Sequence, residues 1–446
     1  MAAFNIAPYV SHIEANRSVK DAVMEKLRER RPPYRISVTD LTNLKQAYFR
    51  RKYPEIAPPL EKQQLMWKGT GFHKLFGFAV SSEEYLEQFV EAEGVVGKID
   101  IYENVPVEVK TTSALAKGKS LLQQRPTYIE QVGMYCAMVN VGKGEIVIYE
   151  RQGAGESGVV PLTAYHVTFP DLGAVREEMH CRRDLLLQAL TANDPSNLPV
   201  CDWFGRGCDY SAVCDCGTSS VPSSHKIADL AGKVQVDEVT RQRLLDMLGK
   251  PKPSRQFRTN DLVFPRKAYF ERRKSQEAIS EDELAEEKGE SLRSMDEMGF
   301  AGALKGAIQF GSPGEVENIP IQHASLSDLV RLRQGLPTMV RIPKFQSLVE
   351  RGRLPSAFPH YFYRLGFDCA LIDHAKGRLF LYYANIRDEN AKMMVYDVSF
   401  RNLGAIKAEA IRRIELLEKA TSVAQLPRCP SWMCRYCSYR DECGEI

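Results

Sequence analysis

The chain of 446 residues repeats itself along its length, and no other feature limits its fold so strongly. Segments of the first half return in the second half in the same order, with an offset that drifts as loops change length. The pairs are 40–52 with 261–273, 97–110 with 311–324, 128–137 with 361–370, 165–169 with 396–400, and 208–214 with 437–443. A chain of this length suits two or three domains. The repeat therefore predicts two copies of one fold.

The two copies divide the chain into four parts. We expect a helical appendix at 1–34, the first copy at 35–217, a linker at 218–253 and the second copy at 254–446. A polar, proline-containing stretch marks the start of the linker. Each copy reads as a helix, a strand hairpin, a helix, two strands and a cysteine-rich loop. This mixture predicts an α/β or α+β domain, and we expect the α/β class, with a central mixed sheet flanked by helices.

Charge balance and hydropathy narrow the choice of partners. The chain has 60 basic and 57 acidic residues, a formal net charge of +3, so an anionic partner would have to meet a local basic groove. No apolar run approaches the roughly 20 residues of a membrane span, and the start of the chain lacks the pattern of a signal peptide. We therefore expect a cytoplasmic protein without a membrane partner.

Residues 99–110 read as a β-hairpin that carries acidic side chains. Aliphatic and polar residues alternate here, as in half-buried strands. A three-residue connection at 103–105 would put Asp100 opposite Glu108, on one face with Lys110, whereas a two-residue turn would invert one strand. Two carboxylates so close repel each other, and a divalent cation such as Mg²⁺ or Mn²⁺ relieves that repulsion. The lysine could orient a water and offset charge on a phosphate. The competing interpretation is an exposed hairpin with a surface ion pair.

The second copy keeps the framework of this hairpin but not its polar residues. The sequence alignment places Gly314, Gln322 and Ala324 opposite Asp100, Glu108 and Lys110, and Arg293, Arg364 and Asp368 opposite His73, Gln131 and Tyr135. Gln131 and Tyr135 lie four residues apart, on one face of an expected helix. All six polar positions change together in a copy that keeps its glycines and prolines. We infer that the first copy holds the active site.

These residues resemble a known nuclease family. In order and approximate spacing, the matching residues are His73, Asp100, Glu108-Val109-Lys110 and Gln131-x3-Tyr135. They resemble the RecB-like branch of the PD-(D/E)xK nucleases, most of all the CRISPR-associated RecB-like exonucleases, with AddB-type nuclease domains second. The resemblance covers nearly all of residues 35–217. It implies a metal-dependent deoxyribonuclease with the PD-(D/E)xK fold in both copies, the second of them degenerate.

The resemblance also implies a role for each residue. His73, Asp100, Glu108 and the Val109 carbonyl would bind Mg²⁺ or Mn²⁺, Lys110 would position the attacking water, and Gln131 and Tyr135 would steady Lys110 and the DNA backbone. The reaction would be hydrolysis of DNA phosphodiester bonds, by an exonuclease that trims ends. The pathway would be CRISPR adaptation or DNA recombination and repair, with a helicase or a CRISPR integration complex as a partner.

Eight of the eleven cysteines fall into two tight groups. The first is Cys201, Cys208, Cys214 and Cys216, and the second is Cys429, Cys434, Cys437 and Cys443. In a reducing compartment such groups indicate metal ligands, not disulfides. The second group contains a C-x2-C-x5-C pattern that, in the resembling exonucleases, helps to hold a 4Fe-4S cluster. The upstream ligand of that family has no counterpart at 42–45 or 263–266, and four thiolates also suit zinc, so both metals stay open. Cys136, Cys181 and Cys369 are expected to be buried apolar residues.

Two functions from different classes compete. The first is the DNA nuclease, and the second is a non-catalytic scaffold or DNA-binding subunit, stabilised by an Fe-S cluster or zinc, of a larger DNA-processing complex. The intact polar set of the first copy favours the nuclease. A motor is excluded, since residues 117–120 lack the preceding glycine of a phosphate-binding loop. The second copy would bind or position DNA, or pack against the first.

Overall fold

The protein is described from a computed structural model. It describes residues 4–28, 33–56, 58, 60–151, 160–201, 208–214, 221–222, 225–248, 256–274, 281–311, 314–343, 345–434, 437 and 439–444. Within this part of the chain, none of the helices has the length and hydropathy that crossing a bilayer requires.

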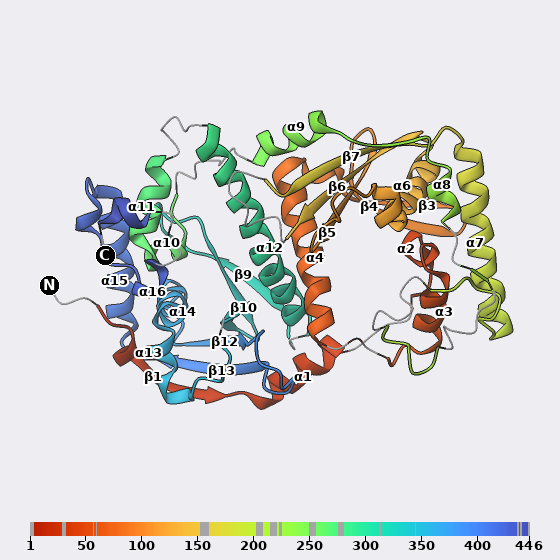
Figure 1. Ribbon diagram of the computed structural model, residues 1–446. Helices are drawn as coiled ribbons and strands as arrows, with labels where there is room; N and C mark the ends of the chain where they lie inside the picture. Colours follow the sequence, from red (N-terminus) through yellow and green to blue (C-terminus); the bar gives the residue numbers. More distant parts are fainter. Residues whose placement is uncertain are drawn as a thin grey trace. The chain divides into compact units, whose positions relative to one another are not determined.

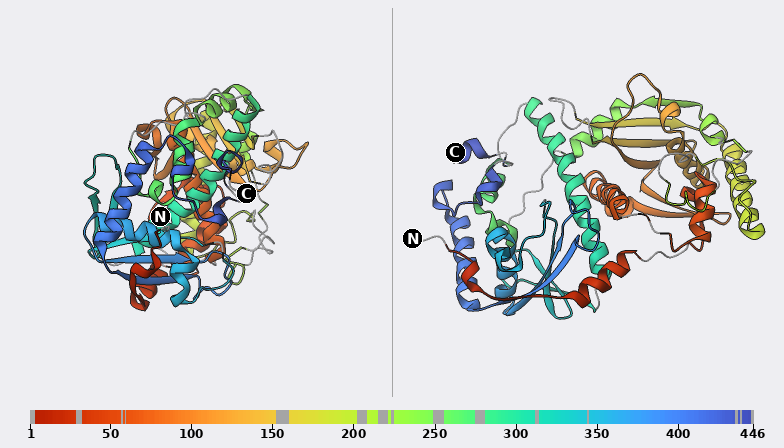
Figure 2. Two further views of the ribbon diagram at one scale, coloured as in Figure 1. Left: turned by 90° about the vertical axis from the view of Figure 1, so that its left-hand side faces the viewer. Right: turned by 60° about the horizontal axis from the view of Figure 1, so that its bottom comes forward.

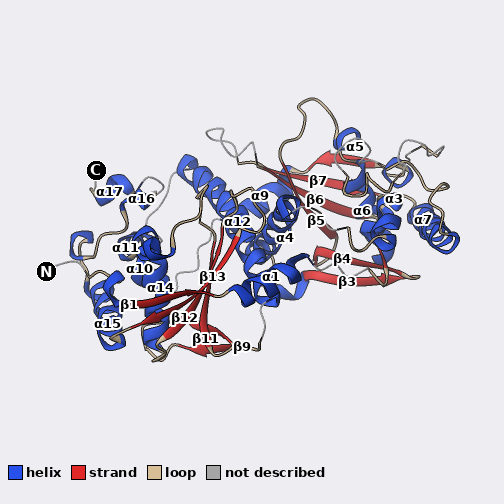
Figure 3. Cartoon of the chain, turned by 90° about the horizontal axis from the view of Figure 1, so that it is seen from below, coloured by secondary structure: helices blue, strands red, loops and turns tan. Residues whose placement is uncertain are grey.

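The chain forms two compact units, each with its own mixed sheet flanked by helices (Figures 1 and 3). Unit 1 comprises Met1–Leu27, Pro251–Ala278 and Lys305–Ile446, and unit 2 comprises Arg28–Lys250 and Ile279–Leu304. Unit 1 thus takes segments from both ends of the sequence and unit 2 takes part of α12 from the second half, whereas the repeat led us to expect two continuous stretches. The α/β class is confirmed.

Unit 2 contains a seven-stranded sheet. Its strands are β2 (Ile36–Ser37), β4 (Val95–Tyr102), β5 (Pro106–Thr112), β6 (Lys143–Glu150), β7 (Leu162–Thr168) and β8 (Lys233–Val236) in that order, with β3 (Leu86–Ala92) also paired to β4. Strands β5 and β6 run parallel, and β6 and β7 antiparallel. The helices are α2 (Val38–Leu41), α3 (Leu44–Lys52), α4 (Leu60–Val80), α5 (Leu121–Gln124), α6 (Pro126–Val139), α7 (Leu172–Ala192), α8 (Lys226–Asp229) and α9 (Glu238–Leu248).

The core of unit 2 follows from strand alternation. Ile146 and Ile148 of β6 are fully buried in one cluster with residues of α6, whereas Val147 is buried in a second cluster with Phe72 and Phe76 of α4. Successive strand residues point to opposite faces, so the sheet presents an apolar surface on each side. Helices α6 and α4 therefore supply side chains to different faces of the sheet.

Unit 1 contains a six-stranded sheet. Its order is β1 (Val10–Ala15), β13 (Met393–Phe400), β12 (Lys376–Tyr382), β11 (Leu336–Arg341), β10 (Leu329–Arg333) and β9 (Val316–Pro320). Its helices are α10 (Thr259–Val263), α11 (Pro265–Lys274), α13 (Leu354–Ala357), α14 (Pro359–Leu371), α15 (Leu403–Lys419), α16 (Ser431–Cys434) and α17 (Arg440–Cys443). Helix α1 (Arg17–Arg28) follows β1, and α12 (Glu281–Gly311) begins in unit 2 and ends in unit 1.

Two expectations about segments outside the copies need correction. Residues 1–34 are not only helical, because β1 pairs antiparallel with β13 at the edge of the unit 1 sheet, seen in Figure 2 as a red strand beside a blue one. The expected linker at 218–253 is folded over its described residues: β8 extends the unit 2 sheet beyond β7. Ile227 of α8 and Leu244 of α9 are buried. Both segments had enough apolar residues to join a sheet or a core.

The two sheets repeat one another in strand order and in detail. Gly144 of β6 lies so close to Val132 and Cys136 that a Cβ atom would clash with them, and Gly377 of β12 meets Leu365 and Cys369 in the same way. These pairs all differ by 233 in number. Strands β11, β12 and β13 therefore correspond to β5, β6 and β7, and β1 takes the place of β8.

This correspondence corrects the sequence alignment of the hairpin. Residues 97–110 form β4 and β5, but 311–324 contain β9, which pairs with β10 as β3 pairs with β4. The counterpart of the first hairpin is therefore β10 and β11. Both aligned segments contain Glu-Asn, an aliphatic residue and Pro, and that shared pattern produced the wrong match.

Strand register gives the true counterparts. Glu108 pairs with Ile146 and Lys110 with Ile148, whereas Met339 pairs with Leu379 and Arg341 with Leu381. Ile146 lies two residues after Gly144, and Leu379 lies two residues after the matching Gly377. Met339 and Arg341 thus take the places of Glu108 and Lys110, and the hairpin register extends the match to Val330 for Asp100. Gly314, Gln322 and Ala324 are not the counterparts.

Helices α4 and α12 cross in unit 2 at two glycines. A Cβ atom on Gly299 would lie 2.5 Å from the backbone carbon of Gly71, so neither position has room for a side chain. We expect Gly299→Ala to destabilise unit 2 by about 1–3 kcal/mol, because the helices would have to separate. Urea unfolding would measure the loss.

Gly302 provides a matched control on the same helix. Apart from its chain neighbours and the backbone of its own helix, nothing lies within 4 Å of a Cβ atom at this position. Gly302→Ala should leave the stability unchanged or raise it by up to about 1 kcal/mol, since alanine favours helix. Equal stability of the two variants would show that the crossing tolerates a methyl group.

Candidate active site

The hairpin of unit 2 has the predicted register. Ile101 pairs with Val107 and Tyr102 with Pro106, which leaves the expected three-residue connection at 103–105. The backbone pairing of β4 with β5 ends there, and Asp100, the residue before Ile101, instead accepts a hydrogen bond through Oδ2 from the Val109 N–H at 2.8 Å. The acidic residues therefore lie where the two strands cease to pair through their backbones.

Asp100 and Glu108 are both largely buried but have different partners. His73 of α4 brings Nδ1 to 3.5 Å from Asp100 Oδ2. Glu108, 3% exposed, accepts through Oε1 from Lys110 Nζ and, at 2.8 Å, from Gln131 Nε2. Its second oxygen, Oε2, is buried and has no hydrogen-bond partner. A buried carboxylate oxygen without a partner is unusual, and this oxygen could bind a cation.

Helix α6 holds the lysine in place. Lys110 Nζ donates to Gln131 Oε1 at 2.9 Å and lies 5.3 Å from the centre of the Tyr128 ring. Gln131 Nε2 also donates to the Tyr135 hydroxyl at 3.1 Å, and that hydroxyl donates to the Lys98 carbonyl at 3.0 Å. One continuous network therefore runs from Glu108 to the backbone of β4.

Burial and neighbouring charges set the protonation of the site. Burial raises the pKa of Glu108 to about 7, against the opposing charge of Lys110. Burial also acts to raise the pKa of Asp100, but the hydrogen bond and charge of His73 and the charge of Lys110 outweigh it, so that pKa is lowered. Burial acts to lower the pKa of Lys110, but the charges of Glu108 and Asp100 raise it. The site thus holds an ionised Asp100, a charged Lys110 and a Glu108 that titrates near neutrality.

The structure brings together all the residues that the sequence singled out in this copy. These are His73, Asp100, Glu108, Val109, Lys110, Gln131 and Tyr135. Sequence reasoning missed Tyr128 and Gly97. Tyr128 lies three residues before Gln131 on the same helical face, and a Cβ atom on Gly97 would lie 2.7 Å from the Tyr135 ring. The recurrence of the tyrosine as Tyr361 could have indicated its role.

The donor set can be compared with the needs of a divalent cation. Among the described residues, no three His, Cys, Asp or Glu side chains are gathered as a metal-binding group. Mg²⁺, however, takes only one or two carboxylates from most proteins and keeps several waters. Asp100 and Glu108 provide two, and Oε2 of Glu108 is buried without a partner. The residues therefore fit Mg²⁺ or Mn²⁺ in type and number.

The second cysteine group lines one cavity in unit 1. Cys429, Cys434, Cys437 and Cys443 surround a space of about 30 Å³ together with Arg266 and other residues. Arg266 lies in the segment where the resembling family has its upstream ligand, and its Nη1 is 3.7 Å from Cys443 Sγ. Four thiols suit zinc or an iron-sulfur cluster in type, and the four sulfur atoms are not gathered as a metal-binding group among the described residues.

The first cysteine group is only partly described. Cys201 is buried and its Sγ accepts from Asn43 Nδ2 at 3.1 Å, again from the upstream segment. Cys208 and Cys214 are half-buried against the core, and Cys216 lies outside the described residues. Among the isolated cysteines, Cys136 and Cys369 are buried as expected. Cys181 is exposed on α7, so its expected burial was wrong.

The counterpart site in unit 1 is basic, not acidic. Val330 and Met339, at the positions of Asp100 and Glu108, are buried. Arg341 takes the place of Lys110 and lies 5.7 Å from the ring of Tyr361, as Lys110 lies near Tyr128. Unit 1 thus lacks the acid pair but keeps the arrangement of a cation beside a tyrosine.

His360 of α14 lies beside this basic site. Its ring centre is 4.1 Å from that of Tyr361. Burial, and then the charge of Arg341, lower the pKa of His360 to about 4. A histidine whose folded pKa is lowered contributes stability above its unfolded pKa of about 6.5 and loses it as the pH falls through the folded value.

We therefore expect a pH-dependent difference between wild type and His360→Gln. Between pH 7.5 and pH 4.5 the wild type should lose about 2–3 kcal/mol more of its unfolding free energy than the variant. Denaturant unfolding of both proteins at the two pH values measures this difference, and common acid effects cancel. If wild type and variant lost the same unfolding free energy, the pKa of His360 would not be lowered in the folded protein.

Comparisons with known proteins add little to this geometry. No family model matches the sequence, and no curated protein matches it. Among solved structures, the crystal structure of SSO0001 is 19% identical over 44% of this chain and 94% of that chain, with a TM-score of 0.30. A TM-score so low carries no argument about fold or function.

Proposed function

We propose that unit 2 is a divalent-metal-dependent deoxyribonuclease of the RecB-like branch of the PD-(D/E)xK superfamily. The observation that carries the proposal is the buried set of Asp100, Glu108 and Lys110 beside Gln131 of α6. Two carboxylates and a lysine at the end of a strand pair suit metal-assisted attack of water on a phosphodiester. DNA is the proposed substrate, and end trimming in CRISPR adaptation or in recombination and repair is the proposed role.

Asp100 and Glu108 would hold Mg²⁺ or Mn²⁺, with His73 and the Val109 carbonyl as further ligands. A bound ion would lower the pKa of a water and polarise the phosphate. In the protein without metal, the ammonium of Lys110 offsets the charge of Glu108. This pairing accounts for two carboxylates close together in a largely buried site.

Lys110 would act on the water and on the phosphate oxygen. Its Nζ keeps its proton because the neighbouring carboxylates raise its pKa. Gln131 and the ring of Tyr128 fix its position, so little reorganisation would be needed during the reaction. Tyr135 fixes Gln131 in turn and would also face the DNA backbone.

The cysteine groups would serve structure and not chemistry. Cys429, Cys434, Cys437 and Cys443 would hold zinc or a 4Fe-4S cluster that pins the C-terminal loop, and Cys201, Cys208, Cys214 and Cys216 would do the same in unit 2. Metal analysis of purified protein, with an absorption spectrum near 400 nm, distinguishes the two. Zinc without visible absorption would indicate a zinc ion, and absorption near 400 nm with bound iron would indicate the cluster.

A degradation assay tests the nuclease directly. End-labelled single- and double-stranded DNA would be incubated with the protein in Mg²⁺, in Mn²⁺ and in EDTA. We expect cleavage with metal and none in EDTA, with the labelled end reporting polarity. A folded protein that binds DNA but leaves it intact with both metals would contradict the proposal.

That outcome would favour a non-catalytic scaffold in a larger DNA-processing complex. One observation supports this second candidate: no three ligand side chains are already gathered around a point in the described residues. Addition of a helicase or integration partner would then be tested for its effect on cleavage.

A further inference from the structure

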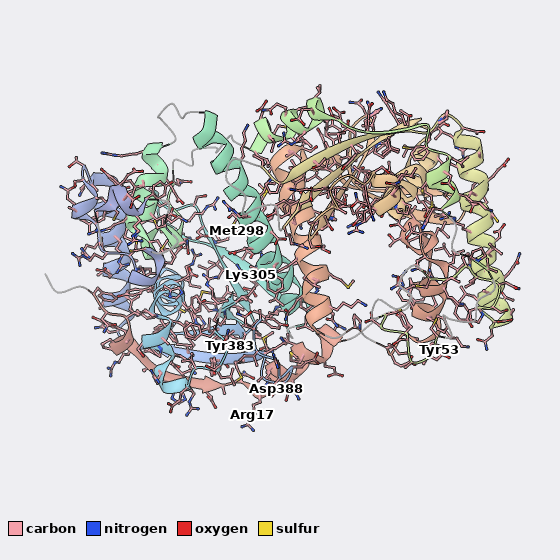
Figure 4. The ribbon with its side chains drawn as sticks, viewed as in Figure 1. Arg17, Tyr53, Met298, Lys305, Tyr383 and Asp388 are labelled. Atoms are coloured by element: carbon pink, nitrogen blue, oxygen red, sulfur yellow. The ribbon has the colours of Figure 1, made fainter. Side chains whose placement is uncertain are left out.

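Unit 1 has gathered cations at the positions of the unit 2 active site. Arg341 of β11 takes the place of Lys110, and Arg364 of α14 takes the place of Gln131. Lys305, labelled on α12 in Figure 4, interacts electrostatically with both arginines. Lys305 lies on α12, the helix before β9 and β10, as His73 lies on α4, the helix before β3 and β4. The Arg293 counterpart expected from the sequence lies in unit 2 instead.

Only one of these three cations is neutralised. Arg364 donates to Asp328 at 2.8 Å and to Asp368 at 3.0 Å. Arg341 donates to the Val340 carbonyl, and no ion pair of its own is recorded among the described residues. Lys305 has neither a hydrogen bond nor an ion pair among them. Both carboxylates bond to Arg364, and Asp368 also acts on Arg341 through its charge, but Lys305 and Arg341 form no ion pair among the described residues.

The environment of Lys305 is unfavourable for a charge. Burial, and then the charges of Arg341, Arg364 and Arg331, lower the pKa of Lys305 to about 8. Burial and the charge of Arg364 also lower the pKa of Arg341. Removing like charges from water without full compensation by counter-charges is unfavourable. An anion between them would offset that free energy.

A phosphate group has the chemistry that suits this place. An arginine fork binds two phosphate oxygens, and a lysine adds a compact charge. Divalent metal is disfavoured, because buried Val330 and Met339 replace the carboxylates that would hold it. A carboxylate carries less charge and fewer acceptor oxygens than inorganic phosphate, and it lacks the tetrahedral arrangement of oxygens of a backbone phosphodiester.

We propose that unit 1 binds a phosphate group between Lys305 and Arg341. The phosphate belongs either to a nucleic acid strand or to free inorganic phosphate. The proposal concerns residues of unit 1 alone and does not depend on nuclease activity in unit 2. If the strand is the source, the degenerate copy is a second contact for nucleic acid within one chain.

The experiment uses the full chain in EDTA, so that no metal-dependent cleavage intervenes. A fluorescent single-stranded oligonucleotide is titrated by anisotropy, and inorganic phosphate is titrated by its effect on thermal unfolding. The proteins are wild type, Lys305→Gln, Arg341→Gln, the double variant and Lys419→Gln. Lys419 lies at the end of α15, with its side chain 77% exposed, and serves as the matched control.

For a strand phosphate, each single variant should bind the oligonucleotide about tenfold more weakly, and the salt slope should fall by about 1 per removed cation. Arg341→Lys should recover part of the affinity, which a packing role would not predict. For free phosphate, the wild type should be stabilised by phosphate and the double variant should not, with oligonucleotide affinity unchanged. A folded double variant that matches wild type with both probes would overturn the proposal.

Discussion

Lys110→Met should lower metal-dependent DNA cleavage by about a thousandfold or more while DNA binding changes little. Loss of one preorganised charge that stabilises a transition state lowers the rate constant by about 10²–10³, and Lys110 would also position the water. Methionine retains most of the side-chain volume, so the contact with Tyr128 is kept without the charge. Single-turnover cleavage and anisotropy on the same DNA measure the two effects.

A control variant and a stability measurement are needed to interpret the effect of Lys110→Met on cleavage. Lys143→Met removes an exposed lysine at the start of β6, in the same sheet, and should cleave as wild type does. Lys110→Met also leaves the buried Glu108 carboxylate without its ammonium partner, so the free energy of unfolding must be measured. The double variant Lys110→Met with Glu108→Gln removes that uncompensated charge and serves as its control. Cleavage at the wild-type rate by folded Lys110→Met would rule out the proposed role of the lysine.

Arg182→Met should destabilise unit 2 by about 3–5 kcal/mol, the range for breaking a buried ion pair. Arg182 of α7 donates to Glu130 at 2.5 Å, to Glu178 at 3.0 Å and to the Leu41 carbonyl at 3.1 Å. Glu130 is completely buried. The variant would leave that carboxylate without its guanidinium, which is the main source of the loss. Urea unfolding measures it.

Arg413 of unit 1 can be compared with Arg182 of unit 2. Arg413 donates to the Leu262 carbonyl at 2.8 Å as Arg182 does to Leu41, but it lies 4.8 Å from the ring of Tyr363, where unit 2 has Glu130. Arg413→Met should therefore cost less, because Glu409 keeps its bonds to Arg412. Arg182→Met with Glu130→Leu should recover most of the stability. An equal loss in the single and double variants would assign the effect to packing alone.

Local patterns in the sequence predicted the site well. Alternation of apolar residues gave the register of β4 and β5, because a slip of one residue would turn Asp100 to the face opposite Glu108. Helical spacing placed Gln131 and Tyr135 on one face, and the structure joins them by a hydrogen bond. Both inferences needed only neighbours within one strand pair or one helix.

Long-range relations could not be predicted in the same way. The pairing of β1 with β13 joins residues 10–15 to 396–400, and nothing in either short strand specifies the other. The counterpart of Glu108 was assigned to Gln322 because two Glu-Asn-x-Pro segments resemble each other. Only backbone pairing with β12 reveals Met339 in that place. Register between distant strands depends on contacts that a linear alignment does not contain.

The N-terminal edge strand has a consequence for synthesis of the protein. Ribosomes add about 5–20 residues per second, so β1 leaves the ribosome roughly 20–80 s before β13, its partner, has been made. Throughout that time β1 offers unpaired backbone groups, which can join other strands. Unit 2 would close first, with only α12 still to come. Pairing of β1 must therefore wait for β13, and a chaperone that holds unpaired strands would act on β1 during that interval.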